Sequence, residues 1–142
     1  MRILAVDVGE RRIGLAISDV SRTLARPLLT LKIRNAGEGV DQVAAEIARL
    51  KAEDDGLSTV VVGLPVRLDG SPNAQTPRVT AFVDALKART PVPILTADER
   101  LSSREAESLL AERERDWRQR KARLDAVAAA VILQDYLEAH RA

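Results

Sequence analysis

The chain has 142 residues and a net charge of +1, which suit one domain over residues 1–142 with a proper hydrophobic core. The near-neutral charge implies no general polyanion-binding surface, so any nucleic-acid contact must come from local patches. The sequence has no cysteine, which excludes thiolate metal sites, and one histidine, His140, which argues against a histidine-based site. Any metal must then be bound by oxygen ligands, which favours Mg²⁺ or Mn²⁺.

The first quarter of the sequence predicts three strands that form an antiparallel meander. The apolar run from Ile3 to Val8 is typical of a central strand buried on both faces. A turn at Gly9-Glu10-Arg11 leads into an alternating strand from Ile13 to Ser18. Leu24 to Ile33 reads as the third strand, and Pro27 places it at an edge or a bend.

The rest of the sequence alternates between helical and extended patterns. A helix is predicted over about Gly39 to Glu53, followed by a short strand from Thr59 to Val62 that stops at Gly63. A loop from Leu64 to Pro77 then leads to a helical stripe from Val79 to Leu86 and a fifth strand from Ile94 to Ala97. The capping box of Ser102 and Glu105 starts another helix, and the last helix runs from Arg123 to Ala139. This order implies parallel strands with right-handed crossovers. We therefore expect an α/β fold with a five-stranded mixed sheet flanked by helices.

Nothing in the sequence predicts export or membrane insertion. The N-terminal apolar run meets a carboxylate at Asp7, too soon for the core of a signal peptide. The longest apolar run, Ala126 to Leu133, is far too short to span a bilayer. We therefore expect a cytoplasmic protein with no membrane partner.

Acidic side chains lie where the predicted sheet could bring them together. Asp7 ends the first strand, Asp98 and Glu99 follow the fifth, and Asp125 lies in the predicted first turn of the last helix. Sites in open α/β sheets form outside the carboxyl ends of strands, and the alanines on the helix face of Asp125 could let it approach Asp7. Clustered carboxylates repel one another unless a cation joins them. Two divalent ions could use them to activate water for phosphodiester cleavage.

Each of these positions also has a structural interpretation. An Asp in a first helical turn is usually a cap or a dipole partner, and an acidic pair after a strand is usually solvated loop. Asp7 is harder to explain in this way, because little is gained by ending a central strand on an acid. The basic run from Trp117 to Arg123 could hold phosphates or be a solvated loop. The loop from Gly63 to Ser71 could contact substrate or serve as a long crossover.

Four groups of motifs occur in order along almost the whole chain. They are Asp7-Val8-Gly9 with Arg12-Ile13-Gly14-Leu15-Ala16 and Ser18-Asp19, Val62-Gly63-Leu64-Pro65 with Asp69-Gly70-Ser71, Asp98-Glu99-Arg100-Leu101-Ser102, and Leu124-Asp125-Ala126-Val127-Ala128-Ala129. Each is weak alone, but four in this order are specific. Together they resemble the YqgF (RuvX-type) family, the Holliday-junction-resolvase-like nucleases of bacteria.

The resemblance implies an RNase H-like fold with strand order 3-2-1-4-5 and an acidic two-metal site for Mg²⁺ or Mn²⁺. It carries catalytic and metal-binding roles onto Asp7, Glu99 and Asp125. Strand parity does not choose between Asp98 and Glu99, and the family pattern favours Glu99. The family is associated with maturation of the 5′ end of pre-16S ribosomal RNA in the cytoplasm.

We therefore expect a metal-dependent nuclease that acts on structured RNA, with ribosomal precursor particles as its partners. The predicted contacts to backbone phosphates are Arg12, Arg100, Lys121 and Arg123. The same chemistry on branched or single-stranded DNA is an alternative, and junction resolution would require a homodimer rather than a monomer. A non-catalytic nucleic-acid-binding factor is another. A phosphotransferase of the sugar-kinase type is disfavoured, because it needs two large lobes and this chain has room for one.

Overall fold

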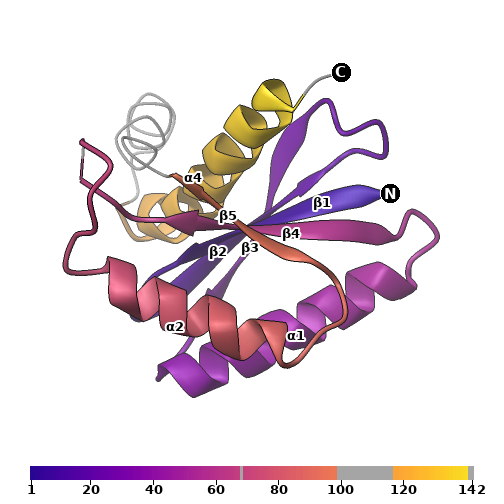
Figure 1. Cartoon of the computed structure of the whole chain (residues 1–142). Coiled ribbons are helices and arrows are strands. Elements are labelled where there is room, and N and C mark those ends of the chain that lie inside the picture. Colours follow the sequence, from indigo (N-terminus) through magenta and orange to yellow (C-terminus); the bar gives the residue numbers. More distant parts are fainter. Residues whose placement is uncertain (68, 99–116, 141–142) are drawn as a thin grey trace.

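The structure is a computed structural model that describes residues 1–67, 69–98 and 117–140, the last of these without side chains for 117–124. Its elements, in chain order, are β1 (Arg2–Val8), β2 (Arg12–Ser18), β3 (Ala25–Lys32), α1 (Ala36–Ala52), β4 (Leu57–Leu64), α2 (Thr76–Lys87), β5 (Ile94–Asp98) and α4 (Trp117–Ala139) (Figure 1). The strands form one five-stranded sheet in the order β3-β2-β1-β4-β5. Strand β1 is central, antiparallel to β2 and parallel to β4, so the predicted mixed sheet is confirmed.

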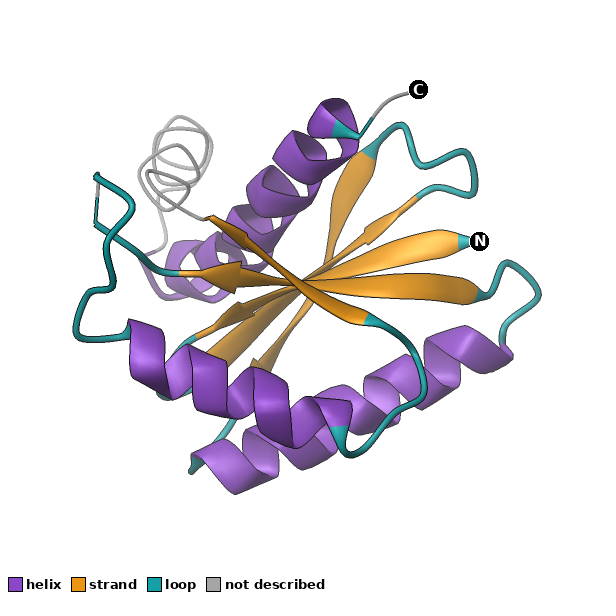
Figure 2. Cartoon of the chain, in the orientation of Figure 1, coloured by secondary structure: helices purple, strands orange, loops and turns teal. Residues whose placement is uncertain are grey.

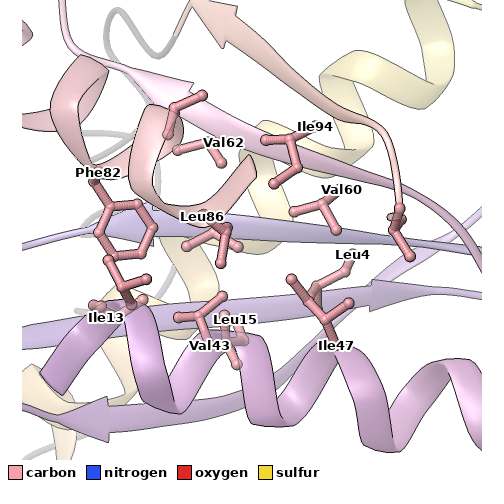
Figure 3. Packing of buried hydrophobic residues seen from close by; sticks show 14 of the residues in the cluster. Leu4, Ile13, Leu15, Val43, Ile47, Val60, Val62, Phe82, Leu86 and Ile94 are labelled. Carbon is pink, nitrogen blue, oxygen red and sulfur yellow. The ribbon is translucent and has the colours of Figure 1, made fainter. Parts of the chain in front are cut away.

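Helices cover both faces of this sheet (Figure 2). Helices α1 and α2 lie on one face, where side chains such as Leu4, Ile47 and Leu86 form the larger apolar core (Figure 3). Helix α4 lies on the other face, where the residues around Leu133 pack against Ala5 and Val61. Because successive residues of a strand point to opposite faces, the even and odd positions of β1 belong to different cores.

The last helix begins earlier than its apolar pattern indicates. It starts at Trp117 rather than at Arg123, and it includes the basic run that we interpreted as a possible loop. Arginine, glutamine, lysine and alanine are strong helix formers, so a run without apolar periodicity still extends the helix. Asp125 therefore lies about two turns inside α4. Its placement in the first turn, and the interpretation as a helix cap, were wrong.

Other boundaries move by one to three residues; helix α1, for example, begins at Ala36 rather than at Gly39. Strands β4 and β5 run on to Leu64 and Asp98, because these two residues continue the parallel ladder. Helix α2 begins at Thr76, inside the predicted loop, and Pro77 occupies its first turn, where a missing N–H costs nothing. The predicted helix after Ser102 lies outside the described residues. Within the described part of the chain, no helix has the length and apolar character needed to cross a membrane.

Candidate active site

Asp7 lies near the C-terminal end of the central strand, on the sheet face that α4 covers. Ile3 and Ala5, at the alternate positions of β1, pack against α4, so the parity of the strand places Asp7 on the same face. Its carboxylate is half-buried, and its cross-strand partner on β2 is Gly14. The central strand of the sheet thus holds an acid at the margin of the smaller core.

Gly14 determines how closely Asp125, the second acid, can approach Asp7. A Cβ atom added at Gly14 would lie 2.0 Å from the main-chain oxygen of Asp125 and 2.8 Å from the nitrogen of Ala126. No side chain fits there, so the backbone of α4 rests directly on β2 at the position opposite Asp7. The prediction that the last helix approaches Asp7 is therefore confirmed at the level of the backbone. The sequence signal for this role was a glycine inside a strand, which often marks a close backbone approach.

Arg12 completes this group of residues. It begins β2, shares the strand face of Gly14, and its Nε atom lies 2.9 Å from Oδ2 of Asp125. The hairpin before it is tight, because the amide of Gly9 donates a 2.9 Å hydrogen bond to the carbonyl of Arg12. A side chain at Gly9 would come within 2.5 Å of that carbonyl. The two glycines thus fix the positions of Arg12 and Asp125 beside Asp7.

The remaining predicted site residues are only partly covered by the structure. Asp98 is exposed, and the alternation of β5 places it on the face of Ile94, which belongs to the core opposite α4. Glu99 and Arg100 lie outside the described residues. Lys121 and Arg123 lie on α4 ahead of Asp125, and their side chains are not described. The described residues therefore bring together Asp7, Arg12 and Asp125.

The side chains at this end of the sheet are of the kind that bind a hard divalent cation. The candidate donors are carboxylate oxygens, which Mg²⁺ and Mn²⁺ prefer. Within the described residues, no group of three or more Asp, Glu, His or Cys side chains is arranged to hold a metal ion. Glu99, the third candidate donor, lies outside the described residues. The guanidinium beside Asp125 shows that this carboxylate already takes a cation as a neighbour.

The sheet order and the acid at the end of its central strand define an RNase H-like domain of the RuvC type. Two solved structures share this fold. They are RuvC of T. thermophilus in complex with a Holliday junction substrate (TM-score 0.54, 17% identity, 98% of this chain and 94% of that chain) and the fowlpox virus resolvase with Holliday junction DNA (TM-score 0.59, 13% identity, 98% of both chains).

Sequence comparison identifies the family. The sequence model of the RuvX family, described as "Holliday junction resolvase", matches residues 1–139. A Chloroflexus aggregans protein is 45% identical over 139 residues, covering 98% of this chain and 94% of its own. A Roseiflexus protein is 39% identical over 140 residues, covering 99% and 96%. Both are named "Putative pre-16S rRNA nuclease". This chain belongs to the RuvX family, and thus to a family of nucleases.

Proposed function

We propose that this protein is a metal-dependent nuclease that processes the 5′ end of pre-16S ribosomal RNA in the cytoplasm. The observation that carries the proposal is the meeting of Asp7 and the backbone of Asp125 across Gly14, at the carboxyl end of the central strand. The position agrees with the rule that sites of open α/β sheets form outside these strand ends. The names of the relatives from Chloroflexus and Roseiflexus support an RNA substrate.

In this proposal Asp7, Glu99 and Asp125 hold Mg²⁺ or Mn²⁺. With such an ion held there, these residues would gain an activated water and charge neutralisation at the leaving oxygen. The contribution of the chain is preorganisation, because the β1–β2 ladder holds Asp7 and the contact of α4 with Gly14 holds Asp125 before any ligand arrives. Arg100, Lys121 and Arg123 are proposed to bind backbone phosphates, which makes affinity for nucleic acid salt-dependent.

The test is cleavage of a pre-16S RNA fragment by wild type, Asp7→Asn and Asp54→Asn, with Mg²⁺, with Mn²⁺ and with a chelator. Asp54 is the matched control, because it is an exposed acid in the turn before β4, at the other end of that strand from Leu64. We expect Asp7→Asn to lose about a hundredfold or more of the activity, since losing a metal ligand removes several kcal/mol of charge stabilisation. Asp54→Asn should cleave like wild type.

The circular dichroism spectrum of Asp7→Asn should match that of wild type, because Asn has nearly the same shape as Asp. Full activity of the purified Asp7→Asn protein with added metal would rule out the proposed mechanism. Chelator-resistant cleavage by wild type would rule out its metal dependence.

Branched DNA is the second candidate substrate, and the description of the RuvX family favours it. Resolution of a four-way junction needs two symmetric incisions, and hence a dimer with two sites. The same protein samples should therefore be assayed on a four-way junction and on single-stranded DNA, with the molar mass in solution measured alongside. A dimer that cuts the junction faster than the RNA would favour the DNA substrate. Measurable RNA affinity without cleavage of any substrate would favour a binding factor.

A further inference from the structure

We propose that Arg12 is an internal counter-ion for Asp125, which positions this carboxylate in the metal-free protein and weakens the binding of divalent cations. The inference rests on the proposed metal site and deepens it. It assigns Arg12 a positioning role that acts through Asp125, whereas the sequence pattern indicated direct contact with substrate phosphate.

The burial of this ion pair sets it apart. The side chains of Arg12 and Asp125 are 31% and 27% exposed. Among the ion pairs between described side chains, each of the other pairs has a partner that is more than one third exposed. The pair of Arg34 with Glu38, by contrast, has an arginine that is 88% exposed. Solvent screens a partly buried pair less than an exposed one, so the attraction between Arg12 and Asp125 is felt more strongly than at a typical surface pair.

The backbone on both sides of the pair is fixed. The Gly9 hydrogen bond sets where β2 begins, and the contact of Gly14 with α4 sets where Asp125 stands. Arg12 therefore reaches Asp125 from a fixed backbone position, and only the side-chain torsions of the two residues remain to be ordered.

These charges have opposite consequences with and without metal. Without metal, Arg12 offsets the repulsion between Asp125 and the nearby Asp7, so it stabilises the fold and keeps the acid in place. A divalent cation that binds the same acids meets the positive charge of Arg12 and must compete with it for Asp125. Removal of the charge at Arg12 should therefore lower the stability of the metal-free protein and raise its affinity for metal.

The experiment compares Arg12→Gln, Arg12→Lys and Arg11→Gln in the full chain, without nucleic acid. Arg11 is the matched control, because it is the preceding arginine and its side chain is exposed. Free Mn²⁺ is measured by electron paramagnetic resonance during titration. We expect Arg12→Gln to bind Mn²⁺ roughly three- to tenfold more tightly than wild type. Arg12→Lys, which keeps the charge, and Arg11→Gln should bind it like wild type.

Thermal melting with a chelator provides a readout that does not depend on metal. Arg12→Gln should melt below Arg11→Gln, and this difference should shrink when both changes are made in an Asp125→Asn background. Equal Mn²⁺ affinity of Arg12→Gln and Arg11→Gln would overturn the proposal, as would equal melting temperatures. If wild type and all variants fail to bind Mn²⁺, the proposed metal site itself is wrong. The positioning role of Arg12 is then decided by whether the melting difference between Arg12→Gln and Arg11→Gln shrinks in the Asp125→Asn background.

Discussion

At the scale of single residues, the site depends on which side of a strand each acid occupies. Asp7 follows Ile3 and Ala5 on the face of β1 that meets α4. Asp98 takes the opposite parity on β5, together with Ile94. Strand parity alone thus places the two side chains on opposite faces of the sheet. The choice between Asp98 and Glu99, which the strand pattern alone left open, stays a prediction, and the parity of β5 agrees with the preference for Glu99.

This argument predicts different effects for two neighbouring substitutions. Glu99→Gln should reduce metal-dependent cleavage by about tenfold or more and weaken Mn²⁺ binding, because it removes a proposed ligand. Asp98→Asn should change both by less than about twofold, because Asp98 is exposed and shares the strand parity of Ile94 rather than that of Ala97. Cleavage rates and Mn²⁺ titrations of the two purified variants provide the check. A larger loss in Asp98→Asn than in Glu99→Gln would reverse the assignment.

At the scale of elements, the contact between α4 and β2 controls the geometry of the site. The helix packs on the sheet through small buried residues, among them Ala126 and Ala129, and its closest backbone contact is with Gly14. The position of Asp125 thus depends on a glycine in a strand far from it in the sequence. Any side chain at Gly14 must push the helix away from the sheet, and Asp125 moves with it.

Gly14→Ala should therefore lower both stability and activity. Overpacking of a close contact costs about 1–3 kcal/mol, which corresponds to a fall of several degrees in Tm. Cleavage should fall further than the loss of folded protein explains, because Asp125 is displaced. The matched control is Gly37→Ala in the exposed first turn of α1, where an added Cβ lies 3.4 Å from Oδ1 of Asn35.

Gly37→Ala should keep full activity and gain up to about 1 kcal/mol, because alanine is the better helix former. The measurements are differential scanning calorimetry and the cleavage rate per folded molecule. Equal melting temperatures of Gly14→Ala and Gly37→Ala would contradict the close packing of α4 on β2.

At the scale of the whole molecule, Arg2 joins elements that are far apart in the sequence. It is 9% exposed, at the start of the central strand. Its guanidinium donates hydrogen bonds to the carbonyls of Leu50 and Gly56 and to the carboxylate of Glu53, the last at 2.8 Å. The end of α1, the turn before β4 and the beginning of β1 are thus held together at the end of the sheet opposite the candidate site.

This bonding makes part of the stability depend on pH. The hydrogen bond from Arg2 lowers the pKa of Glu53 below its usual value of 4.5. A carboxylate whose pKa is lowered by folding contributes stability above its unfolded pKa and loses it as the pH falls through its folded pKa. Wild type should therefore melt above Glu53→Gln at pH 7, and the difference should diminish steadily below about pH 4.5.

Melting temperatures of wild type, Glu53→Gln and Asp54→Asn between pH 3 and pH 7 provide the measurement. Asp54→Asn is the control, because it alters an exposed acid in the same turn. A difference between wild type and Glu53→Gln that stays constant down to pH 3 would show that the Arg2 bond contributes nothing through ionisation.

The sequence predicted most of the regular structure, because burial periodicity is a local property. The five strands, the first two helices and the last helix were all recognised from their apolar patterns, and the family resemblance supplied the strand order. The errors lie at boundaries without apolar signal, and the start of α4 at Trp117 is the largest of them. Helix propensity alone extends that helix, and propensity is a weaker signal than an apolar stripe.

What the sequence by itself determined was the α/β fold, the family and the candidate acids Asp7, Glu99 and Asp125. Only the tertiary structure decided that α4 touches β2 at Gly14, that β5 extends to Asp98, and that Arg12 pairs with Asp125. The physical reason is that a local pattern shows which face of an element is buried. Which residues then meet across that face depends on strand register and on how closely a helix can approach, and both are set by residues distant in the chain.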